Sequence, residues 1–157
     1  MFRKLIPALS LVLLAGCDVP GVPVFGGAGP TITGSVTKLT GNGIRVSLMG
    51  SPAAGAAQRE IASTAVSGGQ FSLTLPGAPP IDLMQQPDES SSIVFTLRAY
   101  QDGNSNGKYD SGEQLCDCSN GQFRYFTSDG PAGSWKAGWN NLAGGRYTQT
   151  FTTAFAL

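Results

Sequence analysis

The sequence predicts an all-β protein built as a single antiparallel β-sandwich. Glycine and proline supply 22 and 10 of the 157 residues, a content that interrupts helices and favours short strands joined by turns. From residue 31 onward, apolar side chains alternate with polar ones in short runs, which is the pattern of a sheet with one buried face. A chain of this length is expected to hold one domain with its own core.

Five alternating runs are expected to form strands. Their apolar positions are Ile32, Gly34 and Val36; Ile44, Val46 and Leu48; Phe71, Leu73 and Leu75; Ile93, Phe95, Leu97 and Ala99; and Tyr147, Phe151, Phe155 and Leu157. Residues 40–43, Thr-Gly-Asn-Gly, predict a hairpin turn between the first two runs because Asn and Gly adopt positive φ at low cost. Residues 59–66 fit a further strand, although the Ala-rich segment 53–66 is also compatible with a short helix.

The first 16 residues have the pattern of a cleaved signal peptide. Arg3 and Lys4 precede an apolar run over residues 5–14, and small residues follow before Cys17. The run is too short to cross a bilayer, which needs about 20 residues. The four residues Leu-Ala-Gly-Cys ending at Cys17 resemble the lipobox of bacterial lipoproteins. This resemblance implies a lipidated Cys17 and an extracytoplasmic protein anchored to a membrane of the cell envelope; the other interpretation is an ordinary cleaved signal.

Residues 17–30 link this anchor to the domain. After Cys17 they read DVPGVPVFGGAGP, a stretch with three prolines and four glycines. Such a composition is typical of an extended tether. The expected organisation is therefore a lipoprotein signal peptide at 1–16, the lipidated cysteine and tether at 17–30, and the β-sandwich at 31–157.

Three segments of the domain carry a family resemblance. Gly-Ser-Val-Thr at 34–37, Ile-Arg-Val-Ser-Leu at 44–48 and Gly-Gln-Phe-Ser-Leu-Thr-Leu-Pro at 69–76 resemble the transthyretin-like, or carboxypeptidase-regulatory-like, sandwich domains. The resemblance covers about residues 31–77. It implies a prealbumin-like β-sandwich that acts as a binding or spacer module, because a fold by itself fixes no chemistry.

Residues 102–113 fit the calcium-loop template D-x-[DN]-x-[DN]-G-x5-E at every specified position. A hard cation takes six to eight oxygen ligands, and one tight loop can supply them from alternate positions. The expected ligands are the side chains of Asp102, Asn104 and Asn106, the carbonyl of Lys108, Asp110 directly or through water, and Glu113. Gly107 permits the sharp turn. The sequence therefore predicts a calcium site, with a solvated turn as the alternative.

The residues flanking this loop do not predict helices. Residues 93–100 are rich in β-branched and aromatic side chains, and 114–119 have no amphipathic helical pattern. The EF-hand-like segment therefore resembles the strand-borne calcium loops of bacterial surface sandwich domains. Calcium is the only cofactor that we expect.

Two further cysteines, Cys116 and Cys118, follow the loop. With Cys17 lipidated they form an even pair in an oxidising compartment, so a mutual disulfide is the simplest expectation. Residues i and i+2 of an extended chain lie near the upper limit of the allowed Cα separation, so this bond would require a bend. Free thiols, an intermolecular bridge and a soft-metal pair are the alternatives.

Apolar side chains in two Gly- and Pro-rich segments are candidate contact surfaces. Trp135 and Trp139 could stack on a sugar or peptide, or could instead close one end of the sandwich. Ile81, Leu83 and Met84 could contact a partner, or could fold back and cap an open end.

Composition excludes several function classes. Ten basic residues balance ten acidic ones, so no basic surface is available to hold nucleic acid. Histidine is absent, which removes Ser-His-Asp and Cys-His nucleophile pairs. The acidic residues of the domain outside the calcium loop show no spacing that predicts a catalytic pair: Glu60, Asp82, Asp88, Glu89, Asp117 and Asp129.

Together these features predict a membrane-anchored extracytoplasmic lipoprotein that is a calcium-stabilised binding or structural module and not an enzyme. Its expected partners are the membrane, through the lipid, and a protein or polysaccharide of the envelope. The alternatives are a carbohydrate-active or other envelope enzyme that uses carboxylates, and a carbohydrate- or peptide-binding module that uses Trp135 and Trp139.

Overall fold

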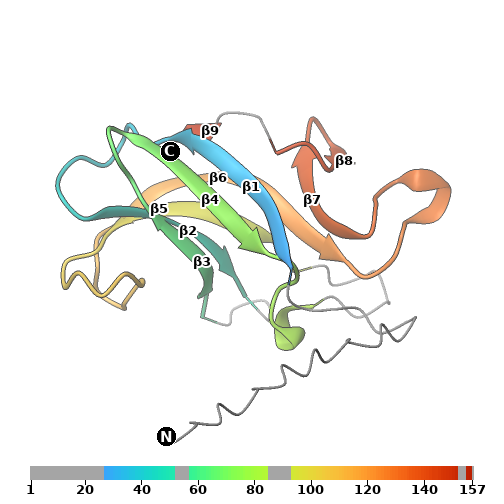
Figure 1. Cartoon of the computed structure of the whole chain (residues 1–157), viewed down its shortest axis with the longest axis horizontal. Coiled ribbons are helices and arrows are strands. Elements are labelled where there is room, and N and C mark those ends of the chain that lie inside the picture. Colours follow the sequence, from blue (N-terminus) through green and yellow to red (C-terminus); the bar gives the residue numbers. More distant parts are fainter. Residues whose placement is uncertain (1–26, 52–56, 85–92, 152–154, 157) are drawn as a thin grey trace, which may run out of the picture.

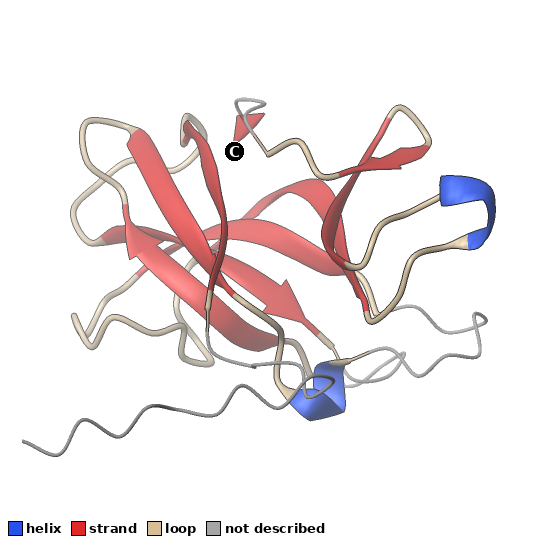
Figure 2. Cartoon of the chain, turned by 45° about the vertical axis from the view of Figure 1, so that its right-hand side comes forward, coloured by secondary structure: helices blue, strands red, loops and turns tan. Residues whose placement is uncertain are grey.

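A computed structural model of the chain describes residues 27–51, 57–84, 93–151 and 155–156, and Figure 1 shows their arrangement. The elements in chain order are β1 (Ala28–Ser35), β2 (Ile44–Gly50), β3 (Arg59–Ala65), β4 (Gln70–Pro76), η1 (Ile81–Leu83), β5 (Phe95–Gln101), β6 (Leu115–Phe126), η3 (Pro131–Gly133), β7 (Gly138–Ala143), β8 (Arg146–Thr148) and β9 (Phe155–Ala156). The predicted all-β class is confirmed. The short 3-10 turns η1 and η3 lie at the periphery of the domain (Figure 2).

The strands form two sheets that pack as a sandwich. The smaller sheet has the order β4-β1-β9 and the larger one β3-β2-β5-β6-β7-β8. Neighbouring strands pair antiparallel, except that β9 runs parallel to β1. Figure 1 shows β1 and β4 crossing in front of the larger sheet.

The core lies between the two sheets and follows the predicted alternation. In β4 the apolar Phe71, Leu73 and Leu75 are buried while the residues between them are exposed. This alternation is the period-2 pattern of a strand with one buried face. In β2, by contrast, Val46 to Gly50 are buried without alternation. Both faces of β2 are therefore covered.

The predicted hairpin between the first two strands is wrong, because β1 and β2 belong to different sheets. Ile32 of β1 instead pairs with Leu73 of β4. Gly41 and Gly43 do adopt positive φ, at 136° and 71°, so the turn chemistry is as expected. Turn residues fix the local backbone, however, and not the strand that the chain pairs with next. Residues 40–43 therefore connect the two sheets.

Segment 59–65 is a strand, and the helical alternative is wrong for these residues. β3 pairs antiparallel with β2, with a register shift between Leu48 and Met49. The remainder of the Ala-rich segment, residues 53–56, lies outside the described part of the chain. Pairing at the edge of the larger sheet satisfies the backbone of β3, and this tertiary pairing overrides the helical propensity of alanine.

The last predicted run is not one strand. Tyr147 belongs to β8 in the larger sheet, and Phe155 belongs to β9 in the smaller one. Phe151 lies between them, is buried, and stacks with Phe123 at 6.3 Å between ring centroids. The chain crosses from one sheet to the other here, and Leu157 lies outside the described residues.

Candidate metal-binding loop

Residues 102–113 form the connection from β5 to β6, as the sequence predicts, with strands and not helices on both sides. The two strands pair antiparallel, and the amide of Gln101 donates to the carbonyl of Gln114 at 2.9 Å across the base of the loop. The loop therefore starts and ends at adjacent points on one sheet (Figure 1).

Asp102 opens the loop with a buried carboxylate. Its side chain is 7% exposed, Oδ1 accepts from the amide of Asn106 at 3.1 Å, and Oδ2 accepts from the amide of Gly107 at 2.8 Å. Gly107 has φ of 80° and Ser105 has φ of 59°, so the chain turns back through the left-handed region twice. Glycine accepts this conformation without a steric cost, which explains its place in the motif.

Asp110 accepts hydrogen bonds from the side chains of both asparagines of the loop. Its Oδ2 accepts from Nδ2 of Asn104 at 2.8 Å and from Nδ2 of Asn106 at 2.6 Å. These bonds, first that from Asn104 and then that from Asn106, lower the pKa of the Asp110 carboxyl below its ordinary value of 3.8. The carboxylate is therefore ionised throughout the neutral range.

The amide oxygens of the same two asparagines bind backbone. Oδ1 of Asn104 accepts from the amide of Asn106 at 3.0 Å, and Oδ1 of Asn106 accepts from the amide of Lys108 at 2.8 Å. Such side-chain turns stabilise the tight backbone of the loop.

Glu113 closes the loop with both carboxylate oxygens. Oε1 accepts from the amide of Gly103 at 2.9 Å, and Oε2 accepts from the amide of Asp110 at 3.0 Å. The last residue of the motif thus bonds to the second and the ninth. Because each carboxylate oxygen has a second lone pair, these bonds leave capacity for a cation.

The carboxylates of the loop do not surround a common point in this conformation. Across the described ranges, no group of three or more His, Cys, Asp or Glu side chains is placed to hold a metal ion. The donor set nonetheless fits a hard cation, because the ionic donors are carboxylates and the neutral ones are amide oxygens. To bind calcium, Asp110 would have to exchange the amides of Asn104 and Asn106 for the ion.

A single carboxylate on the larger sheet holds the loop from below. Oε2 of Glu60, on β3, accepts from the Tyr109 amide at 3.1 Å, from the Tyr100 hydroxyl at 3.2 Å and from the Ser47 hydroxyl at 2.5 Å. Ser47 is fully buried. Burial, followed by the charge of Glu60, raises the pKa of Tyr100, which therefore stays a hydrogen-bond donor at neutral pH.

Two further contacts complete the attachment. The hydroxyl of Ser63, on β3, accepts from Nη2 of Arg45 at 3.0 Å and donates to the carbonyl of Gly107 at 3.0 Å. The rings of Tyr100 and Tyr109 meet edge to face at 5.5 Å between centroids. Glu60, Ser63 and Tyr100 are not part of the sequence motif, because they lie on strands whose pairing brings them under the loop only in three dimensions.

The two tryptophans predicted as a contact surface behave differently. Trp139 is 3% exposed, donates from Nε1 to the carbonyl of Pro76 at 2.7 Å and meets the ring of Phe95 edge to face at 5.0 Å. It closes the sandwich, which is the second of the two alternatives for this residue, and it offers no free face on which a ligand could stack. Trp135 is partly buried and stacks on Phe126 at 4.8 Å between ring centroids. One face of Trp135 is therefore already covered.

The three apolar residues that the sequence offers as a contact surface in segment 76–92, Ile81, Leu83 and Met84, also differ in burial. Leu83 is fully buried and caps the core, whereas Ile81 is 78% exposed and Met84 is half-buried.

Cys116 is buried, at the start of β6, and makes an interaction with its surroundings. The side chain of Cys118 lies outside the described part, as do all of residues 1–26 with Cys17. The disulfide and the lipid anchor therefore stay predictions. In the described ranges, no helix is both long enough and apolar enough to span a bilayer.

Comparison of the chain with protein-family models, with curated proteins and with solved structures finds no match.

Proposed function

We propose that this chain is a lipid-anchored, extracytoplasmic β-sandwich whose loop 102–113 binds calcium, and that it acts as a binding or structural module of the bacterial cell envelope. The observation that carries the proposal is the loop itself. Five oxygen-bearing side chains of the motif, those of Asp102, Asn104, Asn106, Asp110 and Glu113, form hydrogen bonds with one another or with the loop backbone, and Glu60 and Ser63 fix the loop to a sheet.

The charge of the loop suits a divalent cation. Three carboxylates, those of Asp102, Asp110 and Glu113, face a charge of two on calcium, which leaves the occupied site at about −1. Residues Asn104 and Asn106 and the Lys108 carbonyl would supply neutral oxygens. Calcium tolerates the irregular geometry of such a loop, whereas magnesium demands a near-octahedral one and keeps its waters.

The anchor is proposed from the sequence. The lipobox ending at Cys17 implies a lipidated cysteine, and two or three acyl chains hold a protein on a membrane almost irreversibly. The transthyretin-like resemblance of residues 31–77 supports a binding or spacer role. Partition into Triton X-114 tests the anchor: wild type should enter the detergent phase, and Cys17→Ser should remain in the aqueous phase. A Cys17→Ser protein that still enters the detergent phase contradicts the anchor.

The enzyme alternative is not favoured by the described carboxylates outside the loop. Glu60 already accepts three hydrogen bonds. Asp82 pairs with Arg59 at 2.9 Å, and Asp129 pairs with Lys136 at 2.9 Å. An acid and a base for glycoside hydrolysis would have to flank one sugar bond with room for substrate between them. Each of these three carboxylates is instead engaged by its own separate hydrogen-bond or ion-pair partners.

Nuclear magnetic resonance tests calcium binding at the residues themselves. Calcium should shift the side-chain amide signals of Asn104 and Asn106, because binding takes Asp110 away from them, and the change should saturate. Glu113→Gln should abolish it, since the position-12 carboxylate supplies two oxygens and a charge. Asp129→Asn is the matched control. It removes one carboxylate from the segment between β6 and β7, which lies at the other end of the domain from the β5–β6 loop (Figure 1), and should leave the titration unchanged. Signals that calcium does not move would leave the loop as a solvated turn.

A further inference from the structure

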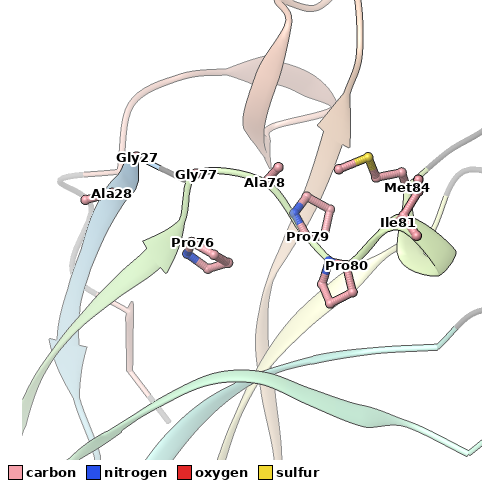
Figure 3. Close-up of a pocket in the computed structure, with 9 residues that line it drawn as sticks. All are labelled: Gly27, Ala28, Pro76, Gly77, Ala78, Pro79, Pro80, Ile81 and Met84. Carbon is pink, nitrogen blue, oxygen red and sulfur yellow. The ribbon is translucent and has the colours of Figure 1, made fainter. Parts of the chain in front are cut away.

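A groove lined by apolar residues lies where the described chain begins. Its volume is about 630 Å³, and its walls are Gly27 and Ala28 on one side and the segment from Pro76 to Met84 on the other. Figure 3 shows Pro79, Pro80, Ile81 and Met84 along the second wall. We call this site the proline groove.

Several contacts hold the second wall of the groove. Trp139 donates to the carbonyl of Pro76, and the amide of Leu83 donates to the carbonyl of Pro80 at 2.8 Å. The ion pair between Arg59 and Asp82 fixes the same turn from outside. Ile81 nevertheless remains 78% exposed beside the fully buried Leu83. The conformation of the turn that buries Leu83 therefore leaves the Ile81 side chain exposed to solvent. A large exposed apolar side chain next to a groove is typical of a contact site.

The chain enters the domain at the rim of this groove. A Cβ on Gly77 would lie 2.4 Å from the carbonyl oxygen of Gly27, and a Cβ on Gly29 would lie 2.5 Å from that of Pro76. Both contacts are too close for any side chain, so the two backbones touch. The described part of the chain therefore begins at the groove.

We propose that the proline groove binds the chain's own tether, through the apolar residues 22–25. They read Val-Pro-Val-Phe and directly precede Gly26 and Gly27. Phe25 is two residues from the groove wall, a reach of about 7 Å, so docking closes almost no loop and the local concentration of the segment is very high. Segment 85–92, which follows the other wall, is polar and acidic and does not match an apolar groove.

Docking of residues 22–25 would determine the distance and the orientation of the domain relative to the membrane. With residues 22–25 bound, only residues 18–21 separate the lipidated cysteine from the domain, a span of at most about 14 Å. The groove would then face the bilayer. This consequence rests on the proposed anchor at Cys17, whereas docking of the tether does not.

Photo-crosslinking from the full chain tests the proposal. The photoreactive residue p-benzoyl-phenylalanine replaces Phe25 in cells, envelopes are irradiated, and the crosslinked peptides are identified by mass spectrometry. We expect a crosslink from position 25 to residues 76–84 of the same molecule, and at least a fivefold lower yield with the probe at position 19. Ile81→Ser together with Met84→Ser should also lower the yield from position 25 several-fold, because they remove the apolar wall.

Other products overturn the proposal. Crosslinks from position 25 that reach a second copy, another protein or lipid in place of residues 76–84 would assign the groove to that occupant. Phe25→Ser should leave calcium binding and detergent partition unchanged. Failure of docking is therefore distinguishable from failure of the calcium site or of the anchor.

Discussion

The amide of Tyr109 donates to Oε2 of Glu60 at 3.1 Å, which joins the calcium-loop motif to a strand 49 residues earlier in the chain. The same oxygen accepts from Ser47 and Tyr100, on the two strands that continue the sheet from β3. One carboxylate thus ties the loop to three neighbouring strands. The loop lies on a fixed support, so an ion that orders it has less conformational entropy to overcome.

Removing this carboxylate should destabilise the domain. Glu60→Ala leaves the buried Ser47 hydroxyl and the Tyr100 hydroxyl without their acceptor, and an unsatisfied buried polar group costs about 1–3 kcal/mol. Urea unfolding should show a loss in that range. Asp82→Ala removes an exposed, ion-paired carboxylate and is the control, with a much smaller expected loss, because exposed ion pairs contribute little to stability. Equal losses in the two variants would contradict the role given to Glu60.

The ring of Tyr109 should matter more than its hydroxyl. Its amide binds Glu60 whatever the side chain, and the ring packs edge to face on Tyr100. Tyr109→Phe keeps that contact and should change stability by less than about 0.5 kcal/mol. Tyr109→Ala removes an aromatic pair worth about 0.5–1.5 kcal/mol and should also weaken calcium binding measured by calorimetry. Equal stability and equal calcium affinity of the Phe and Ala variants would show that the ring of Tyr109 does not support the loop.

Stability in acid should depend in part on Asp129. The amide of Ala137, and then the Nζ of Lys136, lower the pKa of this carboxyl below its ordinary value of 3.8. A lowered pKa in the folded state stabilises the protein above the unfolded value and stops doing so as the pH falls through the folded value. The Tm advantage of wild type over Asp129→Asn should therefore shrink below about pH 3.8. A difference that is constant from neutral pH to about pH 2 would exclude this linkage.

Cys116 and Cys118 are predicted to be paired in protein made in an oxidising compartment. Alkylation of the unfolded, unreduced domain should then add no label, and reduction should expose two thiols. The buried position of Cys116 means that denaturant is needed to separate true pairing from lack of access. Two labels without reductant would show that the pair is open.

The class of fold follows from alternation, and the strands 44–50 and 70–76 follow from it almost to the residue. The pairing of the strands does not follow from alternation. A turn such as 40–43 has the same local chemistry whether it joins neighbouring strands of one sheet or connects two sheets. The sequence leaves the burial of Trp139 open for the same reason. Its hydrogen-bond acceptor, the carbonyl of Pro76, lies 63 residues earlier in the chain, and no local sequence pattern predicts that contact.

The loop illustrates the same division. Every residue of the 102–113 motif could be named from spacing, since the ligands of such a loop are consecutive in the chain. Glu60 and Ser63 could not, because polar residues in a strand usually face water. Only the docking of the loop on the outer face of β2 and β3 turns them into supports.

Thermal unfolding with and without calcium tests whether loop 102–113 binds the ion. A loop of this kind in an extracellular module binds with a Kd of about 10⁻⁴–10⁻³ M. At ~1 mM calcium and a Kd of ~0.1 mM, the folded state gains about 1.4 kcal/mol, which should raise the Tm of this domain by a few degrees. EDTA should remove the increase, magnesium should not replace it, and Glu113→Gln should lack it while Asp129→Asn retains it. Identical melting curves for wild type in EDTA and in ~10 mM calcium would contradict the account.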